Sequence, residues 1–267
     1  MSASSRSVPS RREMLAGGLA SLAAFSAAPA FALRDADVAP PVIDIDDPRF
    51  EQYFNARTAL WSTLGTVDDD VIAYLVSPEF SGAPPWPTTR QAYRVVRTPR
   101  SVILASDGLS DLFVDTSMSE PGFECEVYLE SSDLAGAGFN ALAGSWQFRL
   151  LQSFAQNVAY FGGINSAIDR YGVVSMELPA PEATPARWVT DRDSVGALIN
   201  IEVDDRPSRC ELEEGVEIRI VALTLILPDE TDYIVAGGAD ARRDLAQRLI
   251  ASGAGLVSDS ARSSVLA

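Results

Sequence analysis

Residues 123–130 carry the pattern that most limits the fold, a strict alternation of apolar and polar side chains. The apolar members are Phe123, Cys125, Val127 and Leu129. The residues between them are Glu124, Glu126, Tyr128 and Glu130. Successive side chains of a β-strand point to opposite faces of a sheet, so this segment predicts a strand with one face in the core and the other in solvent. Such half-buried strands are typical of antiparallel sheets.

Other segments have the helical period instead. Apolar residues recur every three or four positions over 47–65 and over 145–161, where Ser145 is the expected cap and Phe161 lies on the apolar face. A closing helix is expected over 240–251. Further strands are expected over 92–97, 101–105, 172–177, 197–203 and 216–227. This order predicts a single α+β domain whose mixed, largely antiparallel central sheet is covered by helices.

The first thirty-two residues predict an export signal rather than part of the fold. Arg11 and Arg12 precede an apolar stretch over 14–28, and a small-residue pattern predicts cleavage after Ala32. The letters SRREML at 10–15 resemble the twin-arginine export motif, and a general secretory signal is the alternative. We therefore expect a periplasmic or secreted protein.

The sequence is expected to divide into three regions. Residues 1–32 form the signal, 33–46 an extended lead-in rich in proline and aspartate, and 47–265 the domain. The small-residue tail from Ser252 is expected to be mobile or loosely docked. No apolar run after the signal approaches the ~20 residues that a membrane-spanning helix needs.

The chain has no histidine and no lysine, which limits its chemistry. Its 21 cationic residues are all arginine and face 37 acidic residues, so the net charge is −16. Serine triads, histidine-ligated metals, Schiff-base lysines and P-loops are thereby excluded. No motif indicates a metal or a cofactor, and the acidity disfavours nucleic acid. We expect a basic protein or peptide as the partner, and the sequence leaves the oligomeric state open.

The letters SDGLSD at 106–111 follow a predicted strand and form the most distinctive loop. Asp107 and Gly108 indicate a tight turn with a positive φ at the glycine, and Ser110 and Asp111 can cap the next turn of backbone. The favoured interpretation is a structural turn beside the sheet. The alternative makes Asp107 and Asp111 an acid pair for glycosidase-like or metal-assisted chemistry.

Two further features have more than one interpretation. The stripe of Glu124, Glu126 and Glu130 is either a solvated strand face or an acidic surface that attracts a basic polypeptide. Cys125 and Cys210 either form a disulfide, which an exported protein permits, or remain two small buried thiols.

Several of these motifs, in this order, resemble the suppressor-of-fused domain family, and the chain would be a bacterial member with a twin-arginine signal. The segments that carry the resemblance are Trp86-Pro87, the strand 102–105, SDGLSD at 106–111, GFECEV at 122–127, the helix from Trp146 and VSDSAR at 257–262. The most specific pair is the GLSD turn with the following strand. Leu112 departs from the proline that family loops often have there. The resemblance covers roughly 47–265, without the second domain of animal members.

The resemblance implies a non-catalytic binding module. Animal relatives sequester a transcription factor by gripping a short peptide, and bacterial relatives often look like immunity proteins that neutralise toxins. No peptide-contact residue of the family can be transferred to this chain. The candidate partner-binding residues are therefore those singled out above: Asp107, Gly108, Leu109, Ser110, Asp111, Glu124, Glu126 and Glu130.

Two functions remain as alternatives. The leading one is an exported, non-catalytic protein-binding module, with an immunity protein as one such role. The other is a secreted carboxylate-dependent hydrolase that uses Asp107, Asp111 or Glu126. An enzyme should gather those acids in one pocket and raise the pKa of one of them. A binding module should leave them scattered along the rim of the sheet.

Overall fold

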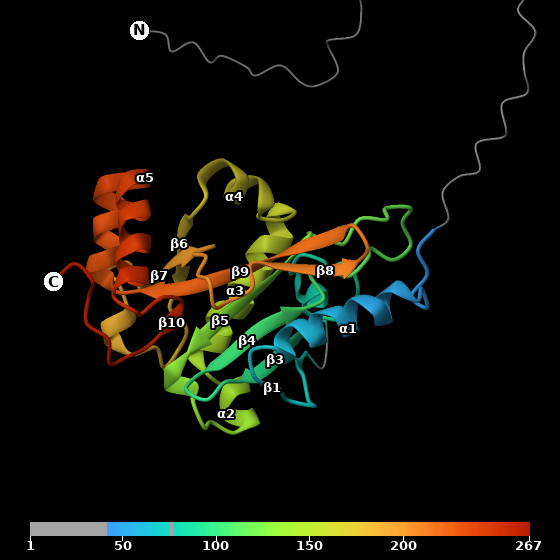
Figure 1. Cartoon of the computed structure of the whole chain (residues 1–267), viewed down its shortest axis with the longest axis horizontal. Coiled ribbons are helices and arrows are strands. Elements are labelled where there is room, and N and C mark those ends of the chain that lie inside the picture. Colours follow the sequence, from blue (N-terminus) through green and yellow to red (C-terminus); the bar gives the residue numbers. More distant parts are fainter. Residues whose placement is uncertain (1–41, 75–76) are drawn as a thin grey trace, which may run out of the picture. The chain divides into compact units, whose positions relative to one another are not determined.

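A ten-stranded sheet runs through the described part of the computed structural model, residues 42–74 and 77–267, and helices cover both of its faces (Figure 1). The described residues belong to one compact unit, so the expected α+β class with a single domain is confirmed. Arg11, Arg12, Ala32 and most of the lead-in lie outside the described residues.

The strands are β1 Thr66–Val67, β2 Ile72–Ala73, β3 Ala92–Arg97, β4 Val102–Asp107, β5 Cys125–Ser131, β6 Val174–Pro179, β7 Ser194–Ile199, β8 Arg209–Glu213, β9 Val216–Ile226 and β10 Val257–Ser258. The α-helices are α1 Arg49–Ser62, α2 Phe139–Ala143, α3 Trp146–Phe161, α4 Asn165–Tyr171 and α5 Pro228–Ala251. Single 3₁₀ turns occur at η1 Pro78–Ser81, η2 Ser132–Leu134 and η3 Ala186–Trp188. The sequence did not predict β1, β8, β10, α2 or α4.

The strand order is β1-β3-β4-β5-β9-β7-β6, and β2, β8 and β10 pair beside this path. All pairs are antiparallel except two, which both involve β5. The first half of β5 lies parallel to β9, and its end, Glu130 and Ser131, lies parallel to β10 instead. Beyond Ala222, β9 pairs with β7. The sheet therefore forks at the carboxyl end of β5.

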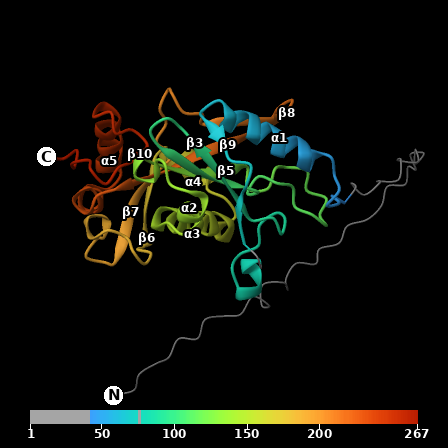
Figure 2. The same ribbon diagram turned by 90° about the horizontal axis from the view of Figure 1, so that it is seen from below.

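Two hydrophobic cores lie on the two faces of this sheet. One core combines α3 with the odd-numbered residues of β5, such as Val127 and Leu129. The other combines α1 and α5 with the opposite face, where Tyr128 lies. Figure 2 shows α1 and α3 on opposite sides of the strands.

The expectation that β5 turns one face to solvent is wrong, because all seven of its residues are buried. The alternation correctly separated two faces. What it did not show is that α1 and α5 cover the face that carries Glu126 and Glu130, so this polar face lies inside the protein.

The predicted helices form with some differences at their ends. Ser145 caps α3 as expected, since its Oγ accepts a hydrogen bond from the Phe148 N–H at 3.2 Å. Helix α5 begins at Pro228, well before the expected 240–251, and is kinked at Gly238, whose φ is +63°. The kink separates the predicted segment 240–251 from an earlier segment of the helix, which begins with a proline and has acidic residues in its first turn.

The carboxyl-terminal tail is docked, which corrects the expectation of a mobile or loose segment. Within it, β10 pairs with β5, and Arg262 forms a bidentate ion pair with the buried Glu230 of α5 at 2.6–2.7 Å. The Val265 N–H also donates to Glu230 Oε1 at 3.0 Å. A single buried carboxylate thus holds the tail at two points.

Cys125 and Cys210 are both buried and free. They belong to different cores, on the two faces of the sheet. Burial raises the pKa of the Cys210 thiol to about 11 and raises that of Cys125 further.

Within the described ranges, no helix combines the length and the apolar character that crossing a membrane would require.

Candidate functional site

The loop 106–111 packs against α1 through a buried arginine. Arg57 has no exposed surface, and its guanidinium reaches three side chains of the loop. Its Nε donates to Asp107 Oδ1 at 2.8 Å, one Nη to Ser110 Oγ at 3.0 Å and the other to Asp111 Oδ1 at 2.8 Å. The loop is therefore fixed to α1 by charge-assisted hydrogen bonds in the interior.

Glu126 of β5 lies inside the turn of the same loop. Its Oε1 accepts hydrogen bonds from the backbone N–H groups of Gly108 and Ser110, both at 3.0 Å, and from Ser110 Oγ at 2.7 Å. Ser106 Oγ donates to Oε2. Arg57 Nε lies 3.8 Å from Oε1. The loop thus wraps around a carboxylate that lies on the neighbouring strand.

Two further arginines complete the cluster on the other side of Asp107. Arg90 donates to Asp107 Oδ2 at 2.6 Å, and Arg94 Nε lies 3.0 Å from the same oxygen. Both guanidiniums stack on the ring of Phe54, at 4.7 Å and 4.2 Å from its centroid. We call Arg57, Arg90, Arg94, Asp107, Asp111 and Glu126 the arginine–carboxylate cluster.

The surroundings shift the pKa values of two of these acids in opposite directions. Burial opposes ionisation of Asp107, but Arg57, Arg94 and Arg90 outweigh it and hold the pKa of Asp107 below its ordinary value. Burial raises the pKa of Glu126, and Arg57 offsets this only in part. Stabilisation by Asp107 is therefore present above its unfolded-state pKa and lost as the pH falls through the lower folded value. Glu126 instead contributes to the stability of the folded protein at low pH, and this contribution is lost as the pH rises through the raised pKa that Glu126 has in the folded state.

The cluster matches neither arrangement that the sequence led us to expect. Asp107, Asp111 and Glu126 do meet, and the pKa of Glu126 is raised, as in many acid catalysts. However, Asp107 and Glu126 have no exposed surface, and Asp111 is 3 % exposed, so a substrate cannot reach them. Arginines from α1 and β3 neutralise these acids, and sequence spacing gave no signal of that pairing.

Most candidate partner-binding residues lie in the interior. Gly108, Leu109, Ser110 and Glu130 are buried together with the three acids of the cluster. The acidic stripe of Glu124, Glu126 and Glu130 is therefore not an exposed face. Glu130 pairs with Arg206, whose Nε and Nη2 donate to its two oxygens at 2.8 and 2.9 Å.

Glu124 is the exception among these candidates, because it is exposed. It precedes β5 with a φ of +53°, and its carbonyl oxygen accepts a hydrogen bond from Asn165 Nδ2 at 3.1 Å. This bond joins the start of β5 to the start of α4. The end of α3 lies at the same place, since an added Cβ on Gly163 would lie 3.6 Å from the Phe123 carbonyl oxygen.

Two aromatic side chains project from this end of α3. Tyr160 is 71 % exposed and Phe161 72 % exposed, and their ring centroids lie 5.1 Å apart in an edge-to-face arrangement. The sequence pattern placed Phe161 on the buried face, which is wrong. Helix α3 ends at Gly162, whose φ is +72°, so its last turn extends past the core. We call Tyr160, Phe161 and Glu124 the aromatic–acidic surface.

Comparison of the chain with protein-family models, with curated proteins and with solved structures finds no match.

Gly108 provides the first test of this arrangement. Its φ is +145°, and an added Cβ would lie 2.6 Å from the Arg90 carbonyl oxygen. Gly108→Val should therefore destabilise the fold by about 1–3 kcal/mol, measured by urea denaturation. Gly136→Val is the matched control, because Gly136 also has a positive φ, +74°, but an added Cβ there meets nothing within 4 Å. Equal losses in the two variants would contradict the close packing of the loop.

Proposed function

We propose that this protein is an exported, non-catalytic protein-binding module of the suppressor-of-fused type, and that its partner is a basic polypeptide. Neutralising a toxin, as an immunity protein does, is one role of this kind. The motif order at 86–127 and the net charge of −16 support this function. The burial of Asp107, Asp111 and Glu126 weighs against the alternative of a carboxylate-dependent hydrolase.

The exposed pair Tyr160 and Phe161 is the observation that carries the proposal. Aromatic side chains are enriched at the energetic centres of protein interfaces, because they bury a large area at a low cost in conformational entropy. Two adjacent rings with more than two thirds of their surface exposed are costly to leave in water. A protein surface that covers them would remove this cost.

The charge around the rings indicates what kind of partner would bind. Glu124 is exposed beside the end of α3 and forms no ion pair among the described residues, whereas the nearby Asp169 of α4 is already paired with Arg219. The carboxyl end of a helix also carries a partial negative charge, and aromatic faces attract guanidinium and ammonium groups. Each of these features favours an arginine or lysine of the partner.

The aromatic pair gives the second prediction. The partner would be captured from envelope extracts with the wild-type protein, purified, and used to measure affinity. The double substitution Tyr160→Ala and Phe161→Ala should weaken binding about tenfold or more. Phe80→Ala is the control, since Phe80 is 85 % exposed but lies in η1. Wild-type affinity in the double variant, or an acidic partner, would contradict the proposal.

The electrostatic part of binding has its own readout. Glu124→Arg should slow association more than it speeds dissociation, and added salt should slow association of the wild type. Asp70→Arg is the control, because Asp70 is also exposed but lies before β2. Reversal at Glu126 is unsuitable for this purpose, because its side chain is buried within the 106–111 loop. If neither added salt nor Glu124→Arg changes the association rate, electrostatic attraction does not contribute to binding.

The expected route of export can be tested separately. Replacing Arg11 and Arg12 together with lysine should leave the protein in the cytoplasm with residues 1–32 still attached, because the twin-arginine route depends on that pair. Cell fractionation followed by mass spectrometry of the amino terminus measures both effects. Normal export and cleavage after Ala32 in this variant would indicate the general secretory route.

A further inference from the structure

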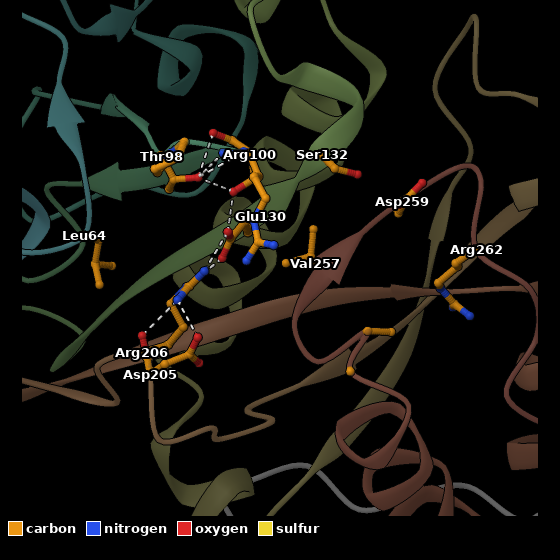
Figure 3. A pocket seen from close by; sticks show the side chains of 14 residues that line it. Leu64, Thr98, Arg100, Glu130, Ser132, Asp205, Arg206, Val257, Asp259 and Arg262 are labelled. Atoms are coloured by element: carbon orange, nitrogen blue, oxygen red, sulfur yellow. Dashed lines mark hydrogen bonds and ion pairs between the residues drawn. The ribbon is translucent and has the colours of Figure 1, made fainter.

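A cavity of about 490 Å³ opens at the fork of the sheet, next to the carboxyl ends of β5 and β10 (Figure 3). Its walls come from the β3–β4 turn, the end of β5, the loop around Arg206 and the chain that enters and leaves β10. A second cavity of about 340 Å³ shares part of these walls. The volume is in the range of small-molecule sites.

The polar floor of the cavity is already satisfied. Arg206 donates hydrogen bonds to both carboxylate oxygens of Glu130. Its remaining nitrogen, Nη1, donates to the carbonyl and the carboxylate of Asp205. Ser101 Oγ also donates to Glu130. Arg262, on another wall, is held by Glu230. These groups form a rigid, neutralised base and are not free to capture a charged ligand.

Two charged side chains at the cavity have no such partner. Within the described part of the chain, neither Arg100 nor Asp259 forms an ion pair. Arg100 lies in the β3–β4 turn and Asp259 directly after β10. Figure 3 shows them on different sides of the cavity. On separate walls, the cavity therefore offers the unpaired guanidinium of Arg100 and the carboxylate of Asp259, which has no ion pair and whose Oδ1 accepts a hydrogen bond of 2.6 Å from the Ala261 N–H.

This distribution of charge selects the ligand. A simple anion would meet Arg100 but also Asp259, in a protein of net charge −16. A simple cation would meet Asp259 but also the unpaired Arg100. No aromatic side chain lines the cavity, so the stacking surface typical of sugar sites is missing from its walls. A molecule that carries both charges satisfies both walls.

We propose that this cavity binds a small zwitterion of the amino-acid class. Its carboxylate would pair with Arg100, and its ammonium would pair with Asp259. The apolar part would lie against Leu64, Pro99 and Val257, which line the same cavity. This site is separate from the aromatic–acidic surface and does not depend on the proposed protein partner.

Calorimetric titration of the full-length protein with the common L-amino acids tests the proposal. The best binder is then compared with two analogues, one that lacks only its ammonium and one that lacks only its carboxylate. For leucine these are 4-methylpentanoate and 3-methylbutylamine. Each analogue should bind at least about tenfold more weakly than the amino acid itself, because it leaves one of the two charged side chains unpaired.

Variants connect this binding to the cavity. Arg100→Gln and Asp259→Asn should each weaken zwitterion binding about tenfold. Arg243→Gln is the control, because Arg243 is 59 % exposed and lies on α5 in an exposed pair with Asp240. The proposal is overturned if no amino acid binds, if either analogue binds as well as the zwitterion, or if neutral sugars bind instead. Unchanged affinity in both cavity variants would also overturn it.

Discussion

Replacing Arg57 with methionine should destabilise the protein by about 3–5 kcal/mol, the cost expected when one partner of a buried charge network is removed. Methionine fills most of the same space, so the loss comes from charge and not from a cavity. Asp107 and Asp111 would each lose a hydrogen bond of 2.8 Å donated by Arg57, and the pKa of Glu126, already raised by burial, would rise further without that cation. Their carboxylates would then be buried without full compensation.

Denaturation in urea, followed by circular dichroism, measures this loss. Arg243→Met is the control, because its ion pair with Asp240 is exposed and such pairs contribute about 0.5 kcal/mol or less. If the two variants lost the same stability, the cluster around Arg57 would not be a major determinant of the fold. A second variant, Asp111→Asn, keeps the shape of the side chain and removes one charge, and it should lose less than Arg57→Met.

Glu230→Ala should have an effect of similar size, about 3–5 kcal/mol, and should also release the carboxyl-terminal tail. Glu230 has no exposed surface. It accepts hydrogen bonds from Arg262, from the Val265 N–H and from the Leu227 N–H at the start of α5. Alanine would leave Arg262 without its carboxylate and would remove the cap of the helix.

Two measurements separate these effects. Thermal unfolding gives the overall loss, and limited proteolysis should show earlier cleavage within residues 257–267. Asp232→Ala, two positions along the same helix, is the control, since Asp232 is 64 % exposed and pairs with the exposed Arg192. A tail as resistant to protease in Glu230→Ala as in the control would show that this carboxylate does not hold it.

Local signals in the sequence predicted many of the elements. The cap at Ser145 and the spacing that follows it placed α3 within one residue of its observed start. Strand β3 was expected over 92–97 and occurs there. These segments have favourable local chemistry and the correct hydrophobic period at once. The strand β8 was missed because it is short and mostly charged, and it forms only by pairing with β9.

The candidate site was found in the sequence only in part. The letters SDGLSD singled out the correct loop, and Gly108 has the positive φ that its turn required. Nothing near the loop indicated Arg57, because it lies 50 residues before Asp107. In α1 it occupies the buried face with Tyr53 and Trp61, where the helical pattern suggested only apolar side chains.

The alternation over 123–130 shows where the contribution of the sequence ends. It determined that β5 has an apolar face and a polar face, because side chains of a strand alternate by geometry alone. Whether the polar face meets water depends on what packs against it, which the strand does not encode. In this protein α1 and α5 cover that face, and arginines from distant segments, Arg57 and Arg206, pair with Glu126 and Glu130. A charge can be buried only where another part of the chain supplies its partner, so the tertiary structure decided between an acidic surface and an interior ion-pair network.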